Sequence, residues 1–282
     1  MLAVIRLICT GYLLLSLVPA NIAHGAGATS AFHEGVKNQR AGKYKEAIAA
    51  YDRASKADPK GAEAYVGRGS ALAQIGQHER AVKDYDEALR LNPNLADAYY
   101  LRGNAYNQLK KYADAVKDYD EALRRNPKSG DAYFNRGVAY LRLGQIERSI
   151  QDLTQAQKLN PKDPEVYAQR GLAHRRLGNN DQAVADYSEA IKLNPKDAEL
   201  YNNRANVYSL LGKYDEAVKD YDEAVKLDSK NARVYANRGA IKLRQRKIDQ
   251  ARNDFKKAME LDPSLKARLD PLMAMEAAPN QR

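Results

Sequence analysis

A segment of 34 residues recurs along most of the chain and constrains the fold more than any other feature. Its clearest copy, residues 62–95, reads AEAYVGRGSALAQIGQHERAVKDYDEALRLNPNL. Seven copies follow one another without a gap: 28–61, 62–95, 96–129, 130–163, 164–197, 198–231 and 232–265. A unit that recurs at this period is typical of a solenoid, in which each copy packs only against its neighbours. The chain is therefore expected to grow by stacking copies rather than by enlarging one core.

Each copy predicts two helices joined by a tight turn. In residues 62–95, Tyr65, Leu72 and Ile75 fall at helical spacing on one face. Gly76 then tolerates the positive φ with which helices often end. A second amphipathic stretch follows, and Pro93 stops it. Neither helix can bury its apolar face alone, so neighbouring copies must cover it.

Fixed positions within the copies support this packing. The second helix carries one alanine in every copy: Ala54, Ala88, Ala122, Ala156, Ala190, Ala224 and Ala258. Three positions earlier the residue is always large: Tyr51, Tyr85, Tyr119, Leu153, Tyr187, Tyr221 and Phe255. The first helix holds a small residue where helices must approach closely: Gly35, Gly69, Gly103, Gly137, Gly171, Ala205 and Gly239. Lys110 and Arg246 replace the turn glycine, at about 1 kcal/mol each if they keep the left-handed conformation.

This pattern resembles the tetratricopeptide repeat. That family shows an aromatic residue, a Leu-Gly pair, tyrosine, alanine, an aromatic residue, alanine and proline on a 34-residue period. Here Tyr65 and its equivalents stand where the family often has tryptophan, and arginine replaces the leucine before glycine. The resemblance implies an all-α fold, an α-α superhelix of helix-turn-helix repeats over residues 28–265.

The flanks of the repeat array have a different character. Residues 1–27 show a basic start at Arg6, an apolar run over 7–20 and a small-residue exit around Ala23 and Gly25. This layout predicts a signal peptide, cleaved between 23 and 28, and export to a bacterial periplasm or the medium. The alternative is an uncleaved segment that anchors the protein to a membrane. Residues 266–282 predict a short capping helix, opened by Asp270 and Pro271, and a tail.

Polar residues precede several of the first helices. Ser129, Asp163, Asp197 and Asn231 are each placed to cap the helix that follows. A capped start fixes where the helix begins, so these positions predict helix boundaries as well as stability.

The sequence offers no motif for catalysis. Cys9 is the only cysteine, and the four histidines match no zinc spacing. There is no phosphate loop, nucleophile elbow or metalloprotease motif. His174 stands where Tyr106, Tyr140 and Tyr208 stand in other copies, which favours a packed core residue. We therefore expect no enzyme activity, no catalytic residue, no metal and no cofactor.

One charged pair repeats with the array. The first helices carry Arg68, Arg102, Arg136, Arg170, Arg204 and Arg238, and 16 residues later the second helices carry Asp84, Asp118, Asp152, Asp186, Asp220 and Asp254. The first copy lacks both members, with Glu34 and Ala50 in their places. The prediction is an Arg–Asp bridge between the two helices of each repeat, since guanidinium meets carboxylate at fixed geometry. The alternative is two solvated faces.

The resemblance also implies where a partner would bind. In the family the first helices line a concave groove that receives peptides. The positions that map to this groove give ten candidate residues for partner binding: Tyr100, Phe134, Asn135, Arg142, Arg175, Arg176, Asn202, Asn203, Asn206 and Asn237. Asparagine bonds a peptide backbone as donor and acceptor, and arginine binds a carboxylate. The lysine/asparagine set with which some family members hold a chaperone tail is absent.

Two functions therefore remain open. The first is an exported scaffold or adaptor that binds a protein or peptide in the groove. The second is a basic surface that binds an anionic polymer or a membrane, because the net charge is +10. Acidic residues (36) are interspersed with basic ones (46), and no run of like charges forms a nucleic-acid-binding tail. We expect no nucleic-acid partner and no stable membrane span after the signal is removed; the sequence does not fix the oligomeric state.

Overall fold

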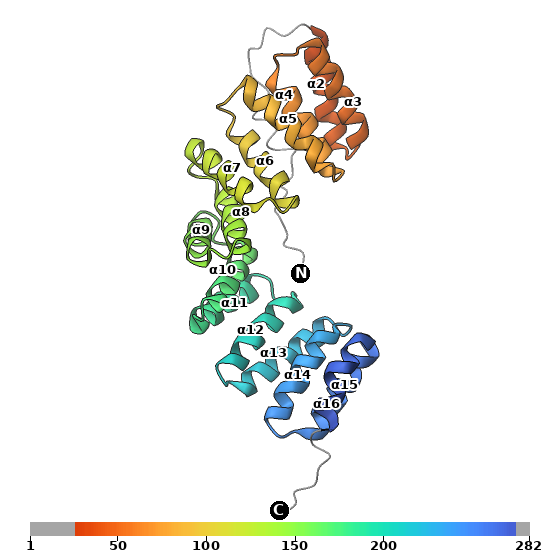
Figure 1. The fold of residues 1–282 in the computed structure, drawn as a ribbon, viewed down its shortest axis with the longest axis vertical. Helices are drawn as coiled ribbons and strands as arrows, with labels where there is room; N and C mark the ends of the chain where they lie inside the picture. The colour runs from red at the N-terminus through yellow and green to blue at the C-terminus, as the bar shows by residue number, and fades with distance from the viewer. Residues whose placement is uncertain (1–25, 275–282) are drawn as a thin grey trace, which may run out of the picture. The chain divides into compact units, whose positions relative to one another are not determined.

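The computed structural model describes residues 26–274, and these form helix pairs followed by a short C-terminal segment (Figure 1). Residues 1–25 of the predicted signal segment therefore lie outside the described residues, whereas Ala26 and Gly27 begin α2. The described chain divides after Leu159 into two compact units. None of the described helices is both long and apolar enough to cross a membrane.

The unit that ends at Leu159 contains four helix pairs. Their bounds are α2 (Ala26–Arg40), α3 (Tyr44–Ala57), α4 (Ala62–Gln74), α5 (His78–Leu91), α6 (Ala96–Gln108), α7 (Tyr112–Arg125), α8 (Gly130–Arg142) and α9 (Ile146–Leu159). The second unit contains three more pairs and the C-terminal segment. Their bounds are α10 (Pro164–Arg176), α11 (Asn180–Leu193), α12 (Ala198–Leu210), α13 (Tyr214–Leu227), α14 (Ala232–Arg244), α15 (Ile248–Leu261), the 3-10 helix η1 (Pro263–Leu265) and α16 (Lys266–Ala274). The all-α fold of tandem helix pairs is thus as predicted.

Within each unit, the first helices of successive pairs contact one another. Contacts join α2 to α4, α4 to α6 and α6 to α8, and in the second unit α10 to α12 and α12 to α14. Within each unit, a second helix that is followed by another pair (α3, α5, α7, α11 and α13) packs between its own first helix and the next one. We call the row of first helices the inner face; it carries the positions that the sequence assigns to a groove.

The core depends on one large side chain and one glycine per pair. Tyr119 of α7 is fully buried. A Cβ placed on Gly103 of α6 would lie 2.8 Å from the Cε1 atom of Tyr119, closer than carbon atoms pack. Glycine at this position is therefore required by the approach of the two helices and not by backbone conformation.

The turns between the helices of a pair contain one residue with positive φ. Gly76 has φ of 78°, and Lys110 and Arg246 have φ of 60° and 59° at the equivalent place. Lys110 and Arg246 thus keep the left-handed conformation, which was the condition for the cost expected of each. The geometry of the turn is set by the packing of the helices, and a non-glycine residue adopts it at a cost.

The helix starts follow the predicted caps at three of four sites. The side chains of Ser129, Asp163 and Asp197 accept hydrogen bonds from the backbone N–H groups of Ala132, Glu165 and Glu199. Asn231 precedes α14 but makes no such bond, so that prediction is wrong.

The C-terminal helix begins earlier than the sequence suggested. It starts at Lys266, after a 3-10 turn in which the Asp262 side chain accepts from the Ser264 N–H, and Pro271 lies inside it. Leu269 is 2% exposed and packs with Phe255 of α15. The burial of Leu269 explains the early start, because the helix must begin before this residue to bring it onto α15.

The predicted Arg–Asp bridge is present in all six copies that carry the pair. Each arginine donates from Nε and Nη2 to the two carboxylate oxygens of its aspartate, over 2.5–3.0 Å. The arginine side chains are only 13–19% exposed. The hydrogen bond with Asp84 raises the pKa of Arg68, against the effect of burial.

A third bond ties five of these arginines to the preceding repeat: Arg68, Arg102, Arg136, Arg204 and Arg238. Arg102 Nη1 donates to Asp86 Oδ1 over 2.6 Å, and Arg204 Nη1 donates to the Ser188 hydroxyl over 2.9 Å. Each such guanidinium thereby joins three helices. Its donors are used within the scaffold, so the repeated charges are structural.

Candidate functional site

Three of the ten predicted groove residues are buried in the first unit. Phe134 is 0%, Asn135 1% and Tyr100 4% exposed. These three side chains therefore belong to the packed interior and are not exposed to a partner. The physical reason is the contact between α6 and α8, which covers these positions of the first helices.

The buried residues form a polar network. Asn135 Nδ2 donates to Asn104 Oδ1 over 2.8 Å and to the Tyr100 hydroxyl over 3.0 Å. The Tyr119 hydroxyl donates to the same Asn104 oxygen over 2.8 Å. The hydrogen bonds of Asn104 and Asn135 join successive repeats, and both side chains are buried, so they do not face a ligand at the surface. Arg142, at the end of α8, is the exposed candidate of this unit.

The same arrangement recurs in the second unit at Asn206 and Asn237. Asn206 Oδ1 accepts from the Tyr221 hydroxyl over 2.8 Å and from Asn237 Nδ2 over 3.3 Å. Both asparagines are half-buried, so part of each side chain serves the scaffold and part faces outward.

The remaining four candidates lie on two neighbouring helices of the second unit. Arg175 and Arg176 are at the end of α10, and Asn202 and Asn203 are on α12. Arg175 and the two asparagines are half-buried, and Arg176 is exposed. Since α10 and α12 contact each other, these side chains lie on neighbouring first helices of the inner face.

Sequence reasoning missed one residue in this region, Tyr187 of α11. Its side chain is buried, and its hydroxyl has no hydrogen-bond partner among the described residues. The Oδ1 atom of Asn202 is also buried and also has no hydrogen-bond partner among the described residues. The available signal was Leu172, which stands where other repeats have Asn104 and Asn206.

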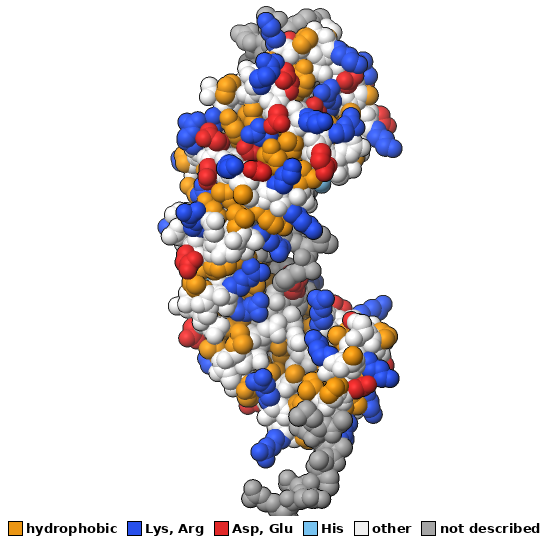
Figure 2. Space-filling view, viewed as in Figure 1, with side chains coloured by type: hydrophobic (Ala, Val, Ile, Leu, Met, Phe, Trp, Pro, Cys, Tyr) orange, Lys and Arg blue, Asp and Glu red, His pale blue; other side chains and the backbone are white. Residues whose placement is uncertain are grey.

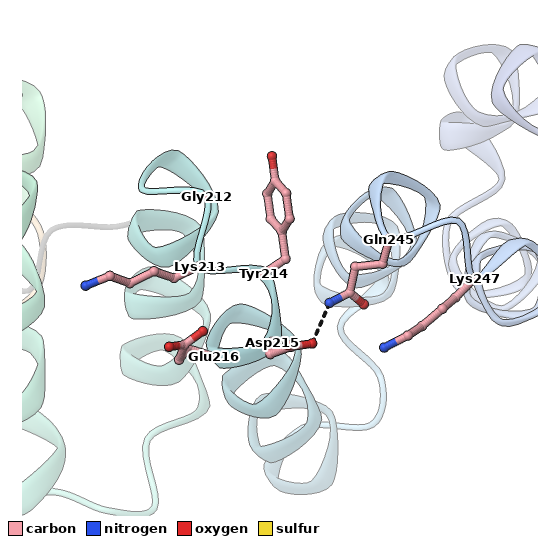
Figure 3. Close-up of a pocket in the computed structure, with 7 residues that line it drawn as sticks. All are labelled: Gly212, Lys213, Tyr214, Asp215, Glu216, Gln245 and Lys247. Carbon is pink, nitrogen blue, oxygen red and sulfur yellow. Dashed lines mark hydrogen bonds between the residues drawn. The ribbon is translucent and has the colours of Figure 1, made fainter.

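A cleft of about 460 Å³ lies elsewhere in the second unit, between the turns that precede α13 and α15 (Figure 3). It is open to solvent and lined by Gly212, Lys213, Tyr214, Asp215, Glu216, Gln245 and Lys247. Across it, Gln245 Nε2 donates to Asp215 Oδ1 over 2.8 Å. In Figure 3 the Lys213 side chain points away from this bond. Because Gln245 and Asp215 already bond to each other and the cleft is open to solvent, we regard it as a surface depression between two turns and not as a binding site.

No group of three or more His, Cys, Asp or Glu residues within residues 26–274 is placed to hold a metal ion. The carboxylates that recur most often, such as Asp118 and Asp152, accept from arginines of the scaffold. These carboxylates therefore serve the scaffold.

Tandem helix pairs with tyrosine–glycine packing and left-handed turns define a tetratricopeptide repeat solenoid, a fold that is generally a non-enzymatic scaffold for protein–protein interaction. The model of the family described as cilia and flagella-associated protein 70 C-terminal domain matches residues 28–275. The chain belongs to this family of tetratricopeptide repeat proteins. No curated protein sequence matches it significantly.

Solved structures share the fold. YrrB, described as a tetratricopeptide repeat protein with an unusual peptide-binding site, is 25% identical with a TM-score of 0.60, over 71% of this chain and 99% of YrrB. MamA from Desulfovibrio magneticus is 25% identical with a TM-score of 0.58, over 61% and 97% of the two chains. A tetratricopeptide repeat protein from Parabacteroides merdae is 23% identical with a TM-score of 0.64, over 90% and 100%, and shows the fold alone.

Proposed function

We propose that this protein is an exported, non-enzymatic scaffold that binds a protein or peptide in a groove formed by its first helices. The observation that carries this proposal is the group on α10 and α12. Arg175, Asn202 and Asn203 are half-buried on these two helices, and the Oδ1 atom of Asn202 has no hydrogen-bond partner among the described residues. Groups of this kind suit an extended peptide, whose backbone offers both donors and acceptors.

The similarity to YrrB supports the same proposal. That protein is a tetratricopeptide repeat protein with a peptide-binding site, and this chain covers nearly all of it. We therefore propose a partner for the present chain only by class, a protein or a peptide.

Site-specific photo-crosslinking tests whether the partner binds to the inner face formed by the first helices or to the outer face formed by the second helices. A photoreactive amino acid at Asn203, on the inner face, should crosslink a partner in the envelope fraction of the host. The same amino acid at Lys219, exposed on the second helix α13, is the matched control. Crosslinking from position 219 but not from 203 would place the contact on the outer face and reject the groove.

Export rests on the sequence of residues 1–27, of which the structure describes only Ala26 and Gly27. The proposal predicts a mature N-terminus between His24 and Thr29. N-terminal sequencing of protein expressed in its host gives the answer. An intact Met1 on a protein in the cytoplasmic fraction would contradict export.

The distribution of charge argues against the basic-surface alternative. On the face drawn in Figure 2, Lys and Arg side chains alternate with Asp and Glu and do not form one continuous basic area. Binding to an anionic polymer releases counterions and weakens steeply with salt. A partner whose affinity falls by orders of magnitude between low and physiological salt would favour that alternative.

A further inference from the structure

In the second unit, the eleventh residue of each repeat lies beside the arginine bridge of that repeat. Counted from 164, 198 and 232, this residue is His174, Tyr208 and Lys242. His174 Nε2 lies 3.9 Å from Asp186 Oδ2, the same oxygen that accepts from Arg170 Nε over 3.0 Å. A side chain that can take up a proton therefore lies next to a buried ion pair that joins α10 to α11.

The seventh repeat shows how the bridge accommodates a cation at this place. Lys242 Nζ lies 2.9 Å from Asp254 Oδ2, while Arg238 still donates to both carboxylate oxygens of Asp254. The side chains of Lys242 and Asp254 are only 12% and 6% exposed. The aspartate of a bridge can thus accept a second cation from the eleventh residue. A protonated His174 has the equivalent acceptor, Asp186, within reach.

The sixth repeat carries a neutral side chain at the same place. Arg204 Cζ lies 5.7 Å from the centre of the Tyr208 ring, and Arg204 donates twice to Asp220, both over 2.8 Å. The bridge therefore forms with an uncharged neighbour as well as with a charged one. Only histidine, in the fifth repeat, gives this place a charge that depends on pH near neutrality.

The surroundings of His174 fit the neutral ring. Its Nδ1 atom is buried and has no hydrogen-bond partner among the described residues. Protonation gives both ring nitrogens an N–H, and a buried charged donor without an acceptor is costly. The His174 carbonyl accepts from the N–H groups of Leu177 and Asn179 over 3.1 and 2.9 Å. Because the backbone is held in this way, the ring itself must move when it becomes charged.

The charged groups around the ring come from two helices. Within the second unit α10 packs against α11 and α12. Asp186 of α11 and Arg170 of α10 act on His174, whereas Glu199 and Arg204 of α12 do not. Burial lowers the pKa of His174, Asp186 raises it and Arg170 lowers it. A histidine with a lowered pKa stabilises the folded form above its unfolded value of about 6.5, and this contribution is lost as the pH falls below that value.

We propose that His174 makes the fifth repeat sensitive to acid: the protonated ring competes with Arg170 for Asp186 and loosens the contact between α10 and α11. The proton comes from solvent and stays on the imidazole, and Asp186 keeps its negative charge. At neutral pH the ring is uncharged, and the bridge holds the two helices as it does in the sixth repeat. This inference concerns the scaffold itself and does not depend on the partner or on the face that binds it.

NMR of the full chain tests the competition directly. The ring signals of His174 and the Nε–H signal of Arg170, assigned with His174→Tyr and Arg170→Lys, are followed from about pH 7.5 to 5. Both are expected to shift with one common midpoint. The matched control is the Nε–H signal of Arg204, which should stay constant because Tyr208 remains neutral over this range. An Arg170 signal that stays constant, or a His174 ring that remains neutral throughout, would overturn the proposal.

Thermal unfolding measures the loosening. His174→Tyr and His174→Lys place at position 174 the neutral and the charged residue found at the equivalent positions 208 and 242. Between about pH 7.5 and 5.5, the midpoint of the unchanged chain should fall by roughly 2–5 °C more than the midpoint of either variant. His174→Gln is a further neutral variant for the case that tyrosine does not fit.

The change with pH is compared within each protein, so a variant that is less stable at both pH values still gives a result. A fall of equal size in the unchanged chain and in the variants would show that acid acts elsewhere and would reject the role of His174. A greater fall in His174→Lys than in the unchanged chain would reject it too, because a permanent cation has no proton to take up in this range.

Discussion

Removal of Arg136 measures how much the arginine bridges contribute. Arg136 donates from Nε and Nη2 to Asp152, over 2.7 Å each, and from Nη1 to Asp120 over 2.6 Å. The Asp152 side chain is 8% exposed and the Asp120 side chain 50% exposed. Arg136→Leu therefore strands one buried carboxylate and one solvated carboxylate, and the two losses differ in size.

The magnitudes follow from these exposures. Breaking a buried pair by removing one partner costs roughly 3–5 kcal/mol, because the remaining charge stays buried without compensation. An exposed pair contributes about 0–1 kcal/mol. We expect Arg136→Leu to lower the free energy of unfolding by roughly 3–5 kcal/mol, and Asp120→Asn by about 1 kcal/mol or less.

The double variant isolates the buried pair. Adding Asp152→Leu to Arg136→Leu removes the stranded charge and should recover roughly 2–3 kcal/mol. Urea unfolding followed by circular dichroism gives the values, analysed with a nearest-neighbour repeat model because a solenoid need not unfold in one step. Strict additivity of the two leucine changes, or a cost for Asp120→Asn equal to that of Arg136→Leu, would refute the reasoning.

Three further predictions concern the turn, the buried histidine and the close approach of helices. Lys110→Gly should raise the free energy of unfolding by roughly 0.5–1 kcal/mol in a urea titration, because φ of 60° strains a non-glycine residue; a decrease would contradict this. Burial lowers the pKa of His174, and the Asp186 charge opposes this only in part, so the neutral folded form loses stability as pH falls below about 6.5. His174→Tyr should make the thermal midpoint less sensitive to acid, and an unchanged pH profile would count against the assignment. Gly103→Ala brings a methyl group against the Tyr119 ring and should cost roughly 1–3 kcal/mol by the same urea assay; a neutral effect would show that the helices separate freely.

The helix pairs and the bridges could be predicted because their signals repeat. Gly76 and Pro93 mark a turn and a stop within one copy, and seven copies in register remove the ambiguity of any single one. Arg68 and Asp84 are absent together from the first copy, which indicated that they act as a pair. Such features depend on residues within one repeat or on the period itself.

The state of the inner-face residues could not be predicted in the same way. Phe134 and Asn135 are buried by contact with the preceding first helix, and the periodicity of a single helix carries no information about that contact. Tyr187 belongs to the regular packing set, so its sequence neighbours gave no reason to select it. The sequence shows Leu172 in place of Asn104 and Asn206, but only the structure shows that the Tyr187 hydroxyl is buried without a partner among the described residues.

The three-helix reach of the arginines has a consequence for how such an array lengthens. Arg102 closes a bridge inside its own copy and takes its last partner, Asp86, from the copy before. A duplicated 34-residue segment of this kind would therefore carry an arginine that pairs with the aspartate of the copy before it. It would also carry an aspartate that pairs with the arginine of the copy after it. Each such copy makes the same ion pairs with its neighbours as the copy from which it was duplicated. Addition or loss of an internal copy that carries both aspartates, such as the copy with Asp118 and Asp120, therefore leaves none of these arginines without a carboxylate, and the length of the array can change; in the fifth copy Ser188 replaces the second aspartate.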